Sequence, residues 1–69
     1  MNDDLQKIVG KNLKKLRVKK KLTQKEVAIA LSTNQSRISE YEQGKYLKRI
    51  VFLKRLAKFY NVKVQSLFL

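Results

Sequence analysis

Apolar residues recur at steps of three and four along almost the whole chain, and no alternating apolar and polar run of useful length interrupts them. This is the period of an α-helix with one apolar face, so it constrains the fold more than any other feature. The apolar sets fall at residues 5–16, 27–31, 38–41, 50–60 and 64–69. Because 69 residues suffice for one small domain, we expect residues 1–69 to form a single all-α domain, a compact bundle of five short helices.

The chain contains no histidine and no cysteine. This excludes zinc fingers, disulfide scaffolds and nucleophilic sites built on either residue. The five acids are scattered and too few to form a binding site for a hard cation such as calcium or magnesium. We therefore expect no enzymatic activity, no cofactor, no metal and no small-molecule ligand. No apolar run approaches the roughly 18 residues that a membrane span needs, and the first residues do not resemble a signal peptide, so we expect a cytoplasmic protein.

The net charge of +12 is distributed unevenly along the chain. Residues 1–21 hold eight bases and two acids, residues 22–44 hold two bases and three acids, and residues 45–69 hold seven bases and no acid. A nearly neutral middle between two basic flanks suggests a segment that reads a partner and flanks that bind a polyanion.

The neutral middle contains the signals of two short helices joined by a tight turn. Thr23 with Glu26 forms a capping box, and the polar triplet 32–34 ends in Asn34, a good N-cap for the next helix. Gly44 suits a left-handed stop after that helix. This pattern predicts a helix-turn-helix motif at residues 24–43, whose second helix would fit the major groove of B-DNA.

The second motif helix has a polar outer face. Ile38 and Tyr41 are expected to face inward, which turns Ser36 and Glu40 outward. The first residues of such a helix and its next outward turn are the natural readers of base edges.

These residues resemble the Cro/phage-repressor type of helix-turn-helix regulator, the XRE family, whose domain is lambda-repressor-like. The likeness runs from about Val9 to Phe68. It depends on a set of fixed offsets, which are Gln24, Ala28, Ile38, Glu42, Gly44, Leu56 and Ala57. The resemblance implies a transcriptional regulator, in most cases a repressor, that binds a palindromic operator in double-stranded DNA as a homodimer.

The resemblance also assigns roles to individual residues. Base contacts are implied for Gln35, Ser36, Arg37, Ser39 and Glu40. Phosphate contacts are implied for Thr23, Gln24, Asn34, Gln43, Lys45, Tyr46, Lys48 and Arg49. An internal salt bridge is implied between Arg17 and Glu42, and Gln24 is expected to brace Gln35. The last helices of this family commonly form a two-fold interface, which would here comprise Val64, Leu67, Phe68 and Leu69.

The sequence departs from the family pattern at three places. Lys21 and Ser32 stand where family members often have glycine, so a left-handed backbone there would be strained. The usual start of the fourth helix, Pro followed by Ser or Thr, is missing. Glu40 would place a negative charge in an electronegative groove unless it accepts a hydrogen bond from a base amine, and it could instead pair with Arg37.

Two alternative functions remain open on the sequence alone. The segment 48–60, taken by itself, could form an amphipathic interfacial helix, which would make the chain a cationic membrane-surface-binding protein. The high positive charge would also suit a nonspecific nucleic-acid binder. Within the leading interpretation, a phage repressor, a restriction-modification controller, an antitoxin and a fragment of a longer protein are equally compatible with the motif.

Overall fold

The computed structural model describes residues 2–45 and 50–69, and its regular elements are all helical in that part of the chain. In chain order they are α1 (Asn2–Lys19), α2 (Gln24–Ala30), α3 (Gln35–Glu42), α4 (Ile50–Phe59) and η1 (Val64–Phe68). The all-α prediction is therefore confirmed. The expected count of five helices is slightly off, because residues 2–45 and 50–69 contain four α-helices and the fifth element, η1, is a 3-10 helix. A segment of five residues whose N-cap makes no side-chain hydrogen bond suits this tighter, shorter form.

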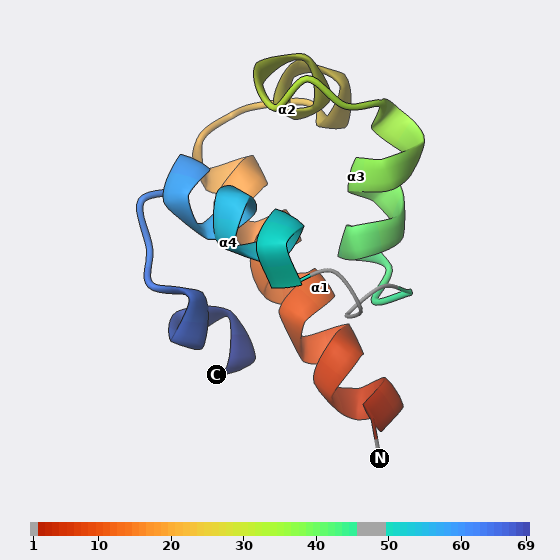
Figure 1. Cartoon of the computed structure of the whole chain (residues 1–69), viewed down its shortest axis with the longest axis vertical. Coiled ribbons are helices and arrows are strands. Elements are labelled where there is room, and N and C mark those ends of the chain that lie inside the picture. The colour runs from red at the N-terminus through yellow and green to blue at the C-terminus, as the bar shows by residue number, and fades with distance from the viewer. Residues whose placement is uncertain (1, 46–49) are drawn as a thin grey trace.

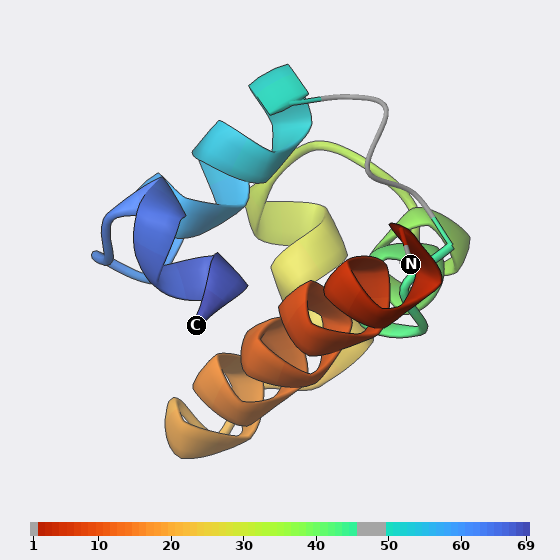
Figure 2. The same cartoon turned by 90° about the horizontal axis from the view of Figure 1, so that it is seen from below.

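The long helix α1 forms the centre of the arrangement. It contacts α3 on one side and η1 on the other, while α2 packs on α3 and α4 packs on η1 (Figure 1). The view from below shows the same order, with α3 and η1 on either side of α1 (Figure 2). The molecule measures 32 × 21 × 20 Å.

One hydrophobic core receives side chains from all five elements. Its buried members are Val9, Leu13, Val27, Ala28, Leu31, Ile38, Tyr41, Phe52, Leu53, Leu56, Ala57, Tyr60 and Leu67. The apolar stripe of α1 is only partly buried, because the exposed fractions of Leu5 and Ile8 are 39% and 40%. These two residues lie in the N-terminal half of α1, the end that projects beyond the other helices (Figure 1).

All four α-helices are followed by the same type of stop. A residue with positive φ follows each helix, namely Lys21 (59°), Ser32 (55°), Gly44 (75°) and Asn61 (59°). The next N–H then donates back to a carbonyl five positions earlier, at distances of 2.8–3.2 Å, as in a Schellman motif. The prediction of a left-handed stop at Gly44 is confirmed, and Lys21 and Ser32, which stand where family members often have glycine, have left-handed backbone as well.

Gly10 allows α1 to approach the end of α3. A Cβ atom at this position would collide with the backbone carbonyl oxygen of Glu42 and would lie 2.9 Å from the backbone nitrogen of Gly44. Gly44 is equally close to α1 in return, since a Cβ there would lie 2.8 Å from the carbonyl oxygen of Gln6. The two glycines therefore set the contact that fixes α3 on α1.

Candidate functional site

The outer face of α3 borders a shallow, open hollow of about 370 Å³. The residues that line it come from α2, α3 and the segment after α3, and they are Gln24, Gln35, Ser36, Ser39, Glu40, Gln43 and Lys45. Apart from one acid and one base, the lining consists of amides and hydroxyls. Such groups both donate and accept hydrogen bonds, so this face can recognise a partner by a pattern of donors and acceptors.

The N-terminal end of α3 presents its first side chains to solvent. Gln35 and Ser36 are exposed in the first turn. Asn34 is the N-cap, and its Oδ1 accepts a hydrogen bond of 2.8 Å from the backbone N–H of Arg37. One turn later Gln43 donates to the hydroxyl of Ser39 at 2.8 Å, which joins two of the lining residues.

The N-terminal end of α2 has a complete capping box. The Oγ1 of Thr23 accepts from the backbone N–H of Glu26 at 3.1 Å, and the backbone N–H of Thr23 donates to the Glu26 carboxylate at 2.8 Å. The hydroxyl hydrogen of Thr23 is not used in either bond and can be donated to a phosphate. The cap thus fixes an exposed hydroxyl at the start of the helix that precedes α3.

A network of hydrogen bonds lies behind the hollow. Arg17 donates from Nε to one carboxylate oxygen of Glu42 at 2.7 Å and from a terminal nitrogen to the other oxygen at 3.1 Å. Its remaining terminal nitrogen donates to the carbonyl of Leu22 at 2.9 Å. Gln24 also donates to the Glu42 carboxylate, at 3.1 Å. The salt bridge that the resemblance implied is thus extended to the first residue of α2, a contact that sequence reasoning missed.

Two groups in or beside this network have raised pKa values. Donation of hydrogen bonds to the Glu42 carboxylate raises the pKa of Arg17 above its usual value, since this effect outweighs the opposing effect of burial. Tyr60 packs in the core nearby, where burial raises the pKa of its phenol to about 12, with a further contribution from the negative charge of Glu42. Both groups therefore keep their protons at neutral pH.

The structure does not group Arg37 with the residues around the hollow. Its guanidinium carbon lies 5.9 Å from the centre of the Phe52 ring, a cation–π arrangement that points it toward α4. Arg55 stacks on the same ring at 5.6 Å and donates to the carbonyl of Leu31 at 2.7 Å. The sequence pattern gave no signal for this pair of arginines around one aromatic ring.

The remaining predicted site residues lie elsewhere. Of the four assigned to a dimer interface, Leu67 is a core residue, 1% exposed, while Val64 and Phe68 are half-buried and Leu69 is 93% exposed. A partner could therefore reach Val64, Phe68 and Leu69 but not Leu67. Among the predicted phosphate contacts, Tyr46, Lys48 and Arg49 lie outside the described residues.

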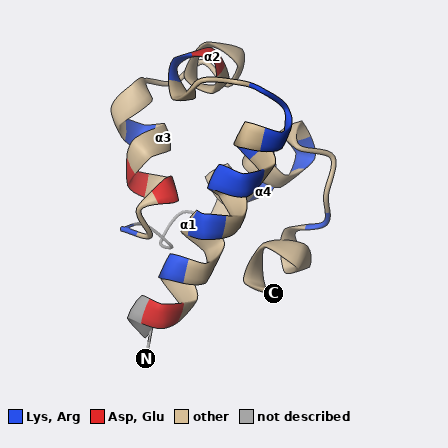
Figure 3. Ribbon diagram, turned by 180° about the vertical axis from the view of Figure 1, so that it is seen from behind, with Lys and Arg blue, Asp and Glu red and all other residues tan. Residues whose placement is uncertain are grey.

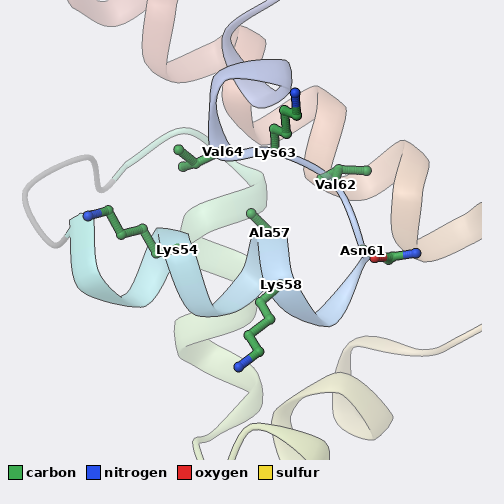
Figure 4. Close-up of a pocket in the computed structure, with 7 residues that line it drawn as sticks. All are labelled: Lys54, Ala57, Lys58, Asn61, Val62, Lys63 and Val64. Carbon is green, nitrogen blue, oxygen red and sulfur yellow. The ribbon is translucent and has the colours of Figure 1, made fainter.

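Basic residues gather away from the hollow. Seen from behind, bands of Lys and Arg run along α1 and α4, whereas α3 shows both signs of charge (Figure 3). A second hollow, of about 590 Å³, lies between α4 and the chain that leads into η1. Its three lysines, Lys54, Lys58 and Lys63, point in different directions (Figure 4) and so do not converge on one small anion.

Neither a metal site nor a membrane-spanning helix is found in residues 2–45 and 50–69. Their His, Cys, Asp and Glu side chains form no group of three or more that could hold a metal ion. None of the helices that can be described is both long enough and apolar enough to span a bilayer.

Comparisons with known proteins agree with this geometry. The profile of the helix-turn-helix domain family matches residues 10–69. The DNA-binding domain of BldD from S. venezulae superposes with a TM-score of 0.82 at 26% identity, over 96% of this chain and 99% of that domain. A hypothetical transcription factor, NHTF, from Neisseria has a similar fold, with a TM-score of 0.86 at 22% identity over 100% of this chain and 79% of its own. No curated protein matches the sequence. Because the family profile covers most of the chain, the protein belongs to the helix-turn-helix domain family of the XRE type.

Proposed function

We propose that the chain is a sequence-specific regulator of transcription that binds double-stranded DNA through α3 and acts as a repressor. The observation that carries this proposal is the outer face of α3, where amides and hydroxyls line a hollow beside the N-terminal end of an eight-residue helix. A single helix fits the major groove, about 12 Å wide, and its N-terminal residues then meet base edges. The likeness to the BldD DNA-binding domain supports this reading.

In this proposal four residues of α3 contact bases from two successive turns, and Arg37 lies beside them. Gln35 and Ser36 read bases from the first turn, while Ser39 and Glu40 contact them one turn later. Glu40 accepts a hydrogen bond from the amine of cytosine or adenine, since its carboxylate has no ion-pair partner in the described part of the chain. Arg37 contacts bases only at the side of this face, because its guanidinium lies over the Phe52 ring and points toward α4.

The contacts to the backbone of DNA surround this face. Thr23 and Gln24 at the start of α2, with Asn34, Gln43 and Lys45 next to α3, hold the phosphates. Tyr46, Lys48 and Arg49, which lie outside the described residues, are also proposed to contact phosphates. Backbone contacts position the protein and supply salt-dependent affinity, whereas the α3 side chains supply the sequence preference.

A homodimer would place two α3 helices on successive turns of a palindromic operator, about 34 Å apart. The interface we propose is the C-terminal surface with Val64, Phe68 and Leu69 at its exposed part and Leu67 beneath it. An exposed Leu69 beside a half-buried Phe68 supports an apolar contact between copies. Residues 1–69 would then act as one DNA-binding domain in the cytoplasm, and a bound dimer would repress by occupying the operator.

Selection of bound duplexes from a random pool at about 150 mM salt tests the whole proposal. We expect an enriched palindrome, whose half-site spacing reports the dimer. Gln35→Ala and Ser36→Ala should relax the preference at individual base pairs. Lys45→Ala should instead weaken all duplexes alike and reduce the salt slope by about one. Equal loss on selected and random duplexes for all three variants would contradict sequence-specific binding, and a pool without enrichment would leave a nonspecific binder.

A further inference from the structure

The solvent-facing side of α1 has a chemistry that differs from that of the α3 hollow. Five exposed residues at helical steps of three and four form it, and we call them the lysine face: Lys11, Lys14, Lys15, Val18 and Lys19. They border an open hollow of about 480 Å³. Figure 3 shows several bands of Lys and Arg along α1. None of the five residues lines the hollow beside α3.

The positive charge of the lysine face is not balanced by any described carboxylate. No lysine of this face forms an ion pair with a described carboxylate. Lys15 stands four residues from both Lys11 and Lys19, and like charges at this spacing repel each other on a helix. The arrangement therefore opposes folding slightly, and an anionic partner that bound there would relieve the repulsion.

The floor of this hollow is apolar. Val18 is 56% exposed, and the other lining residues are lysines, whose aliphatic stems can lie along the surface while their ammonium groups reach the rim. A fitting partner must therefore supply both carboxylates and an apolar side chain. The sugar-phosphate backbone of DNA supplies only the charge, and a single exposed valine is too little apolar surface to anchor the chain in a membrane.

A second copy of this chain is a poor match for the lysine face. The sequence holds only five acids against 17 Lys and Arg, so a second copy offers few carboxylates to this face. Of these acids, Glu42 is held by Arg17 and Glu26 closes the capping box of α2. The occupant must come from a protein with more acidic surface than this one.

We propose that the lysine face is a docking surface for an acidic segment of a different protein, which seats a large apolar side chain over Val18 between the lysine stems. Carboxylates on either side of that apolar side chain then meet the ammonium groups of Lys11, Lys15 and Lys19. Because the face shares no residue with the α3 hollow, this binding does not depend on the proposed recognition of DNA.

Fluorescence anisotropy with a labelled 18-residue peptide of Glu and Ala that has one central Leu tests the proposal at about 150 mM salt. The triple variant Lys11→Gln, Lys15→Gln, Lys19→Gln should bind this peptide about tenfold more weakly than the unchanged chain. The matched control, Lys54→Gln, Lys58→Gln, Lys63→Gln, removes the same charge from α4 and its neighbouring loop and should change binding less than about twofold. Circular dichroism checks that both variants remain folded.

The apolar contact is tested separately. Val18→Ser in the protein, or Ser in place of the central Leu in the peptide, should each weaken binding about fivefold. The proposal would be overturned if the two triple variants lost peptide affinity equally, or if neither serine substitution weakened binding. Either result would show that the peptide is held only by nonspecific attraction between its carboxylates and the basic protein. The proposal would also be overturned if the α1 variant lost affinity for a random duplex, or for vesicles containing anionic lipid, while its affinity for the peptide stayed unchanged.

Discussion

Arg17 in α1 holds Glu42 at the end of α3 through two hydrogen bonds, and the exposed fractions of the two side chains are only 13% and 5%. The same carboxylate accepts from Gln24 at the start of α2. One acidic side chain thus joins three helices directly behind the face that we propose for DNA recognition. The orientation of α3 relative to α2 depends on it.

Glu42→Gln should therefore be strongly destabilising. It keeps the shape of the side chain but leaves the guanidinium of Arg17 partly buried without a counter-charge, which we expect to lower the free energy of unfolding by about 2 to 3 kcal/mol. Urea denaturation measures the loss. Glu40→Gln is the matched control, because this neighbouring acid makes no ion pair within the described residues, and it should change stability by less than about 0.5 kcal/mol. Similar losses for both variants would contradict the role of Glu42.

Gly10→Ala should also be destabilising, although alanine is the better helix former. In an ordinary helix interior this exchange stabilises by about 1 kcal/mol. Here the added Cβ would meet the backbone carbonyl of Glu42, so α1 and α3 would have to separate. We expect a loss of at least about 2 kcal/mol, measured as a lower thermal midpoint. Lys11→Ala, at the exposed position next to it, should leave the midpoint nearly unchanged, and a stabilised Gly10→Ala protein would disprove the close approach.

The sequence was informative wherever one local pattern determines the outcome. Helical periodicity predicted the all-α fold, and the capping box at Thr23 and the N-cap at Asn34 predicted where α2 and α3 begin. The left-handed stop at Gly44 followed from a glycine placed just after the end of the helix.

Features that depend on distant parts of the chain were not predictable. The contact of Gly10 with the end of α3 joins residues more than thirty positions apart, and nothing local marks it. The stacking of two arginines on Phe52 and the burial of Leu67 have the same origin. Periodicity could also not show that α1 extends past the core, which leaves Leu5 and Ile8 exposed.

Lys21→Gly should stabilise the protein. Lys21 has φ of 59°, a region in which a side chain costs about 1 to 2 kcal/mol, whereas glycine enters it freely but orders a more flexible chain. The expected net gain is about 0.5 to 1 kcal/mol, seen as a higher urea midpoint. Asn61→Gly is the comparison, because asparagine tolerates this backbone better than lysine does and should gain less. Equal gains at the two positions would show that side-chain strain is not the cause.

Stability should fall at alkaline pH because of Tyr60. Burial raises its pKa to about 12 in the folded protein, against 10 in the unfolded chain. Below pH 10 the phenol is protonated in both states, so its contribution is fully present. Between pH 10 and 12 only the unfolded chain releases the proton, so stability should fall by about 1.4 kcal/mol per pH unit and by about 2 to 3 kcal/mol in total. Urea unfolding of the unchanged chain and of Tyr60→Phe over this range isolates the effect, since the lysines titrate in both proteins. The unchanged chain should lose more stability than Tyr60→Phe, and parallel curves would rule out Tyr60 as the source.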